Sequence, residues 1–181
     1  MTRSSLDDWT TFYQGADRFS RYLRFAGYNS AVVTVMCEGA TLYPSQHVDG
    51  TPKYDSGVFF TTGQDPVRKD VLEMLLRKFD QRGLTLIPAI QFSSPLPALE
   101  KQLRQDPSKA TGIELMGAQG KSWTDTRGTR RGMAPYYNPL DPWVQQEMHR
   151  VIDELVERYQ HHPSFGGLAI QMSSESYSQL P

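Results

Sequence analysis

The chain has 181 residues, enough for one domain with a sizeable buried core. Its 19 basic and 20 acidic residues leave a formal net charge of -1, so it lacks the basic excess of a dedicated nucleic-acid-binding domain. Hydrophobic residues make up 38% of the chain, as in folded globular proteins, and no apolar run approaches the roughly 20 residues of a membrane span. We therefore expect a single domain over residues 1–181 without a nucleic-acid or membrane partner.

The first helix is predicted over residues 6–26, where apolar side chains recur at spacings of three and four. These side chains are Trp9, Phe12, Tyr13, Ala16, Phe19 and Leu23. Gly27 stands where a helix commonly ends in a left-handed residue. The apolar, β-branched segment 31–36 follows, and its composition predicts a strand that is buried on both faces.

The second unit repeats this order. Asp65 and Pro66 supply a capping side chain and a proline at the first helical position, which predicts that a helix begins there. The apolar stripe of this helix consists of Val67, Val71, Leu72, Leu75 and Phe79. Gly83 ends the helix, and residues 84–90 are predicted to form the next strand. Because Pro88 cannot donate to a strand ladder, we expect it at a bulge or near the strand end.

The third unit begins at Asp141 and Pro142, which again combine a cap with a proline at the first helical position. Its apolar stripe consists of Val144, Met148, Val151, Ile152, Leu155 and Tyr159. The helix is predicted to end near residues 161–163. Residues 165–172 are predicted to form the next strand, and we expect residues 167–172 of it to pair with the neighbouring parallel strand.

Alternating helices and buried strands predict an α/β fold in which the three strands are parallel and adjacent in sequence order. The connections from helix to strand are short, whereas those from strand to helix are long. The long loops cover residues 37–64 and 91–140, which are 28 and 50 residues. Both follow the carboxyl ends of strands, the edge at which parallel α/β sheets and barrels place their active sites.

No sequence motif predicts a cofactor. Residues 117–122 look like a phosphate-binding loop, but two residues separate the glycines where that loop needs four, and no strand precedes them. No G-x-G-x-x-G motif follows a predicted strand. His161 and His162 stand at a helix end, where positive charge suits the helix dipole, so we expect a structural role and no bound metal. The single cysteine, Cys37, excludes an internal disulfide but does not indicate the cellular compartment.

Two carboxylates at predicted strand ends are the candidate catalytic residues. Glu38 follows the strand at 31–36, and Glu175 follows the strand that ends near Met172. An acid at a strand tip can be held partly desolvated, which raises its pKa for proton donation. Glycoside hydrolysis uses two such carboxyl groups. The structural alternative for Glu38 is a loop residue paired with an arginine.

Aromatic and amide side chains in the long loops and at the strand ends suit a sugar, whose apolar face stacks on rings while its hydroxyls form hydrogen bonds. The alternative is that the aromatic residues hold long loops to the body of the domain. The residues predicted to bind substrate are Tyr43, Gln91, Phe92, Trp123, Tyr137, Asn138 and Gln171.

The chain resembles glycoside hydrolases of the (β/α)8-barrel type, in particular the glycosyl-hydrolase-like barrel proteins. The resemblance rests on residues 137–143 (YNPLDPW), the helix end at Arg158 and Tyr159, and residues 165–170 (FGGLAI). In such barrels a strand with an acid at its tip is commonly the fourth strand. The resemblance implies that Glu175 is the general acid/base of a retaining enzyme and that the nucleophile comes from a later strand. Ser174 stands where many of these enzymes have Asn.

A full (β/α)8 barrel takes roughly 250 residues, so we expect the N-terminal half of a TIM barrel. The first functional hypothesis is a fragment of a retaining glycoside hydrolase that acts on carbohydrate, is inactive alone and can self-associate through its open sheet edge. The second is a non-catalytic carbohydrate-binding or protein-interaction domain. The third is an open α/β sheet with a different small-molecule ligand.

Overall fold

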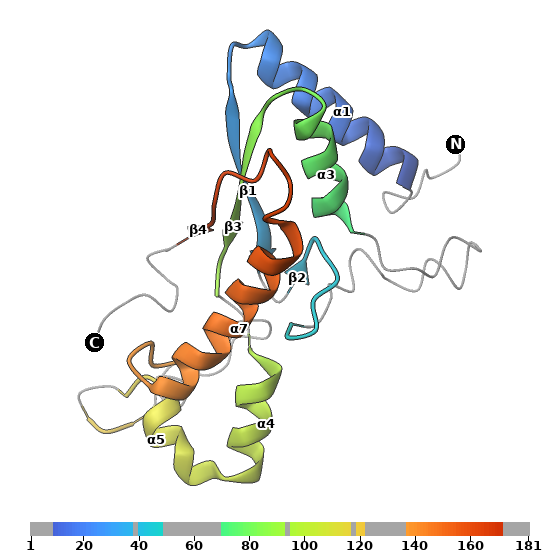
Figure 1. Cartoon of the computed structure of the whole chain (residues 1–181). Helices are drawn as coiled ribbons and strands as arrows, with labels where there is room; N and C mark the ends of the chain where they lie inside the picture. Colours follow the sequence, from blue (N-terminus) through green and yellow to red (C-terminus); the bar gives the residue numbers. More distant parts are fainter. Residues whose placement is uncertain are drawn as a thin grey trace, which may run out of the picture.

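The computed structural model describes residues 9–37, 40–48, 70–92, 95–116, 119–121 and 137–171. It contains a four-stranded sheet in the order β2-β1-β3-β4, with helices packed beside it (Figure 1). The strands are β1 (Ser30–Cys37), β2 (Ala40–Thr41), β3 (Thr85–Ile90) and β4 (Ala169–Ile170). The helices are α1 (Trp9–Phe25), α3 (Val71–Asp80), α4 (Pro97–Gln105), the 3-10 helix η1 (Pro107–Lys109), α5 (Ala110–Ile113) and α7 (Pro142–Tyr159). None of the helices described is long and apolar enough to cross a membrane.

Strands β1, β3 and β4 are parallel and adjacent in this order, which confirms the predicted topology. β1 pairs with β3 from Ser30 opposite Thr85 to Met36 opposite Ile90. β4 is much shorter than the strand predicted over residues 165–172, because only its two residues pair with β3 in a regular ladder. β2 was not predicted; it folds back on the end of β1 as an antiparallel edge.

Pro88 lies inside β3, opposite a bulge in the neighbouring segment. The backbone N–H of Leu86 donates to the carbonyl of Ser164, and the carbonyl of Leu86 accepts from the N–H of Gly166. Because backbone polar groups alternate in direction along a strand, those of Pro88 face the same neighbouring segment. Leu86 bridges to Phe165 and Ala89 pairs with Ala169, so β3 advances from 86 to 89 while its neighbour advances from 165 to 169. The extra residue relaxes the ladder where proline has no N–H to donate, as predicted.

The helix ends follow local capping chemistry. The side chain of Asp141 accepts hydrogen bonds from two N–H groups in the first turn of α7, which confirms the predicted start. The prediction that α3 begins at Pro66 is wrong: it begins at Val71, because the Asp70 side chain accepts from the N–H of Glu73 at 2.9 Å and caps the helix. Asp65 and Pro66 themselves lie outside the described residues.

Two glycines end helices as predicted. Gly27 follows α1 with φ of 80°, and Gly83 follows α3 with φ of 61°. Both values lie in the left-handed region that only glycine enters without strain, so each chain turn into the following strand depends on glycine.

The predicted loop over residues 91–140 contains α4 and α5, so its assignment as loop is wrong in part. Leu96, Leu99 and Leu103 recur at helical spacing in this segment, and the first two are buried in the core. The stripe is short, but it is the signal that could have identified α4.

The core lies between one face of the sheet and the helices. In β3 the core includes Leu86 and Ile90, and in β1 the partly buried Ala31 and Val33 pack against it. The alternate residues Val32, Thr34 and Ile87 share the opposite face, and Val32 is 64% exposed. The prediction that the first strand is buried on both faces is therefore wrong. Helices α1 and α3 therefore lie beside one face of the sheet, whereas α4 and α5 lie beyond the end of the strands (Figure 1). The other face is largely uncovered at β1.

Substituting Gly166→Ala tests the close packing of the bulge against β3. An added Cβ would overlap Cγ2 of Thr85 and lie 3.3 Å from Cγ1 of Ile87, so we expect a loss of about 1–3 kcal/mol in the free energy of unfolding. Gly15→Ala in α1 is the control, because its Cβ would meet nothing within 4 Å and alanine favours a helix by about 0.8–1 kcal/mol. Urea denaturation measures both changes; equal effects of the two substitutions would contradict the packing described here.

Candidate functional site

The parallel strands bring Thr34, Gln91 and Gln171 to the carboxyl-end edge of the sheet. The backbone N–H of Gln91 donates to the carbonyl of Met36 at 2.9 Å, and that of Gln171 donates to the carbonyl of Ile90 at 2.8 Å. The Thr34 hydroxyl donates to Oε1 of Gln171 at 3.0 Å. Three segments that are distant in sequence therefore meet at one edge.

The Thr34–Gln171 hydrogen bond crosses over β3. Thr34 pairs with Ala89, and Ala89 pairs with Ala169, so the bond spans a position occupied by a methyl group. The small side chain of Ala89, which is 3% exposed, leaves room for the amide to reach β1. Because the bond uses the amide oxygen of Gln171, the two N–H donors of the amide point away from Thr34. These donors suit a ligand hydroxyl.

Six of the other predicted site residues divide into two groups. Glu38, Trp123 and Glu175 lie outside the described residues. Tyr43, Phe92 and Tyr137 are 1%, 6% and 0% exposed, so their rings are not open to a ligand in this structure.

The contacts of the buried tyrosines hold segments of the chain together. Tyr43 packs edge-on against Tyr159, with ring centroids 6.0 Å apart. The Tyr137 hydroxyl accepts from the N–H of Leu96 at 3.0 Å and donates to Glu100, which fixes the start of α4. Both contacts agree with the alternative interpretation of the aromatic residues, in which they hold the long loops to the body of the domain.

Asn138 also has a local structural role in the turn before α7. Its Nδ2 donates to the carbonyl of Gly112 at 3.2 Å, and its Oδ1 accepts from the N–H of Leu140 at 3.0 Å. Among the described residues predicted to bind substrate, Gln91 and Gln171 are the two that lie at the carboxyl-end edge without being buried in the core.

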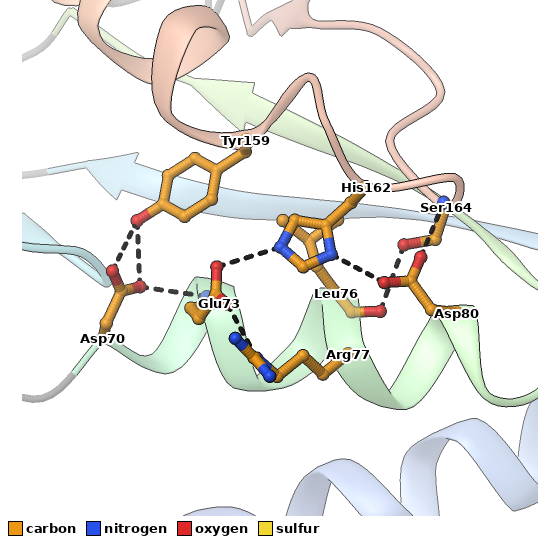
Figure 2. Close-up of polar contacts among 8 residues, drawn as sticks. All are labelled: Asp70, Glu73, Leu76, Arg77, Asp80, Tyr159, His162 and Ser164. Atoms are coloured by element: carbon orange, nitrogen blue, oxygen red, sulfur yellow. Dashed lines mark hydrogen bonds and ion pairs between the residues drawn. The ribbon is translucent and has the colours of Figure 1, made fainter.

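A polar network that was not predicted joins α3 to the end of α7 (Figure 2). The ring of His162 lies between two carboxylates of α3: Nδ1 is 2.6 Å from Asp80 and Nε2 is 2.9 Å from Glu73. Ser164 donates its N–H to Asp80 at 2.8 Å and its hydroxyl to the carbonyl of Leu76 at 3.1 Å. These contacts fix the turn between α7 and β4 on α3.

Charge dominates the protonation of this network. Burial opposes the protonated form of His162, but the hydrogen bonds and charges of Asp80 and Glu73 outweigh it and raise the pKa of His162. Burial also opposes ionisation of Glu73, but hydrogen bonds from His162 and Arg77 lower its pKa. Asp80 follows the same pattern, since bonds from His162 and Ser164 outweigh its burial and lower its pKa.

The amino end of α3 carries a second polar contact. The Tyr159 hydroxyl donates to both carboxylate oxygens of Asp70, at 2.9 and 2.8 Å (Figure 2). Burial raises the pKa of Asp70 despite these bonds. Asp70, Glu73 and Asp80 are three and seven residues apart, so they share one face of the helix, and this acidic stripe is the signal that sequence analysis missed.

A groove of about 500 Å³ lies between α7 and the segment that follows β2. Its lining combines both signs of charge and consists of Gln46, His47, Arg150, Asp153, Glu154, Glu157 and Arg158. None of these described residues is Trp, Tyr or Phe, so the groove lacks the large stacking surface expected of a sugar site.

Residues 8–163 match the family model of Glycosyl hydrolase-like 10. The chain belongs to this family. The match confirms the predicted resemblance, and no curated protein sequence matches the chain.

Solved structures support the fold of this Glycosyl hydrolase-like 10 member. The α-L-fucosidase isoenzyme 2 from Paenibacillus thiaminolyticus superposes with a TM-score of 0.56 at 17% identity, over 88% of this chain and 20% of that one. The β-galactosidase from the psychrophilic Marinomonas ef1 superposes with a TM-score of 0.50 at 15% identity, over 92% and 20%. The fold is thus the α/β, TIM-barrel type of glycoside hydrolases, and the chain spans about a fifth of the length of these two proteins.

The stability of the family member should depend on pH through His162. Because the pKa of His162 is raised in the folded chain, its contribution to the free energy of unfolding is complete below about pH 6.5, the pKa of histidine in the unfolded chain. This contribution is lost as the pH rises through the pKa of His162 in the folded chain. The lowered pKa values of Glu73 and Asp80 mean that their contribution is lost as the pH falls below about 4. We therefore expect maximal stabilisation between roughly pH 4.5 and 6.5.

Urea midpoints measured from pH 4 to pH 9 in metal-free buffer check this expectation. The His162→Gln variant should show a smaller decline of the urea midpoint above about pH 6.5 than the original chain. The His149→Gln variant, changed at an exposed position of α7, should show the same decline as the original chain. A wild-type-like decline in the His162→Gln variant would contradict the assignment.

The two buried tyrosines give opposite predictions for removal of the hydroxyl. The Tyr43 hydroxyl is buried and has no hydrogen-bond partner among the described residues, so Tyr43→Phe should leave the free energy of unfolding unchanged or raise it. Tyr137→Phe leaves the buried N–H of Leu96 without its acceptor and should lower that energy by about 1–3 kcal/mol. Chemical denaturation of both variants measures the contrast, and a larger loss in Tyr43→Phe would contradict it.

Proposed function

We propose that this chain contributes the first strands of a retaining glycoside hydrolase barrel, with the catalytic face at the carboxyl ends of β1, β3 and β4. The observation that carries the proposal is the meeting of Gln91 and Gln171 at one sheet edge. The candidate acids follow the same strands in sequence: Glu38 comes directly after Cys37, and Glu175 comes four residues after Gln171. Family membership and two structural neighbours, an α-L-fucosidase and a β-galactosidase, support a glycoside as the substrate class.

In this mechanism Glu175 protonates the leaving glycosidic oxygen and later deprotonates the attacking water. A second carboxylate attacks the anomeric carbon, which requires carboxyl groups about 5–5.5 Å apart. By analogy with barrel enzymes, we propose that this nucleophile comes from a later strand, and Glu38 is the first candidate within the chain. The amide of Gln171, oriented by Thr34, donates to a sugar hydroxyl.

The uncovered face of the sheet supports a larger barrel. A full barrel takes roughly 250 residues, and its interior is filled by side chains from all eight strands. In this proposal the face with Val32 and Thr34, of which Val32 is exposed, would form part of that interior, and the remaining strands of the barrel would cover it. We propose that the chain is the N-terminal half of such a barrel, lacks glycosidase activity on its own and can associate through β4.

Activity toward aryl glycosides tests the catalytic assignment. We expect the isolated chain not to hydrolyse 4-nitrophenyl α-L-fucoside or β-D-galactoside. In the longer protein, Glu175→Gln should lower kcat/KM by about 10²–10⁴-fold, the usual contribution of a general acid/base. Glu157→Gln is the matched control, because this exposed glutamate lies on α7.

The outcomes separate the hypotheses. Turnover by the isolated chain that Glu175→Gln abolishes would show that a second carboxylate is already present and would overturn the expected inactivity. Equal activity of the Glu175→Gln and Glu157→Gln proteins would remove Glu175 from the mechanism. Saturable binding of fucose or galactose without turnover in the longer protein would favour the non-catalytic carbohydrate-binding alternative.

A further inference from the structure

We propose that Glu73, His161 and His162 form a binding site for a divalent transition-metal ion, with Zn²⁺ as the best fit, between α3 and the turn after α7. A carboxylate oxygen and two imidazole nitrogens, one from each residue, lie within 4.8 Å of one another. Two histidines and one glutamate are a recognised zinc donor set that leaves a fourth position for water. The site is independent of the glycosidase proposal, because none of its ligands lies at the carboxyl-end edge of the sheet.

The surroundings of His162 match those of a metal-bound histidine. Histidine ligands commonly donate the second ring N–H to a carboxylate, which fixes the tautomer and the ring orientation. Nδ1 of His162 is 2.6 Å from Asp80, and Asp80 in turn accepts the N–H of Ser164 at 2.8 Å. The ring is 7% exposed, so its orientation is fixed by packing as well as by hydrogen bonds. This arrangement directs Nε2 toward Glu73 (Figure 2).

The two carboxylates leave a place for one cation. Nδ1–H of His162 can remain on Asp80 while a metal ion replaces the proton between Nε2 and Glu73, which are 2.9 Å apart. Zinc binds nitrogen and oxygen at about 2.0–2.2 Å, so a small widening of this contact admits the ion. The other oxygen of Glu73 accepts from Nε of Arg77 at 2.7 Å, which holds the carboxylate in place.

His161 completes the donor set from the solvent side. Its ring centroid is 4.3 Å from that of His162, with the rings inclined by 38°. Its side chain is exposed and can therefore adopt the rotamer that binds the ion without disturbing the core. The adjacent histidines do not follow a known zinc spacing, and Glu73 is 88 residues away in sequence, so the site becomes visible when the fold is known.

Metal titration of the chain, expressed without a histidine tag and treated with EDTA, tests the proposal. We expect one equivalent of Co²⁺ to give visible d–d absorption bands, Zn²⁺ to displace it, and Zn²⁺ to raise the melting temperature. His161→Ala should weaken Zn²⁺ binding by at least about tenfold, and Asp80→Asn by about 10–100-fold. His149→Ala, at an exposed histidine on α7, should bind as the original chain does.

The exposed position of His161 keeps the test decisive, because its substitution should leave the fold intact, and circular dichroism checks this. Absence of saturable Co²⁺ or Zn²⁺ binding would overturn the proposal. Equal binding by the His161→Ala and His149→Ala variants would overturn it as well, and His162, Glu73 and Asp80 would then form an ion-pair network alone.

Discussion

The contact of His162 with Glu73 and Asp80 fixes the path of the chain from α7 into the sheet. β4 has only two residues in the regular ladder. Because a typical hydrogen bond adds about 0.5–1.5 kcal/mol of net stability, the few bonds of such a short strand cannot determine its position. The buried histidine and Ser164 hold the turn on α3 before the strand begins. The register of β4 on β3, and with it the position of Gln171, depends on that attachment.

The two ends of the parallel strands have different roles. Near the amino ends of the parallel strands, charged hydrogen bonds stabilise the connection between helix and strand. At the carboxyl ends, Thr34 and Gln171 form an exposed polar contact above the small side chain of Ala89. The same separation is general in (β/α)8 barrels, where one rim serves stability and the other carries loops for chemistry. The family and the structural neighbours agree with this assignment of fold.

The sequence predicted the repeated units because their signals are local. Apolar stripes identified α1, α3 and α7, and Gly27 and Gly83 marked the turns into strands through their left-handed backbone. β2 escaped prediction because a two-residue strand has no periodicity. The start of α3 was placed too early because Asp65 and Asp70 are both possible caps, and the observed hydrogen bond at Asp70 decides between them.

The site was less predictable because it depends on contacts between distant segments. Tyr43 and Tyr137 are of a residue type that often binds sugars, but their burial and their contacts are set by the fold and do not follow from the sequence. The attachment of His162 to α3 joins residues 82 and 89 positions apart, which no local pattern indicates. By contrast, the position of Gln91 and Gln171 followed from topology alone, because parallel strands place their carboxyl ends together.

The proposed function requires that the segment carrying Glu175 lie at the edge formed by β1, β3 and β4. Cys37 is the single cysteine of the chain and ends β1, so a nitroxide attached there reports on this edge. Paramagnetic broadening of backbone amide signals in NMR spectra is the most direct measurement. We predict that the amide of Glu175 is broadened together with those of Gln91 and Gln171, whereas that of Arg82 is not. A Glu175 amide as unaffected as that of Arg82 would contradict the account.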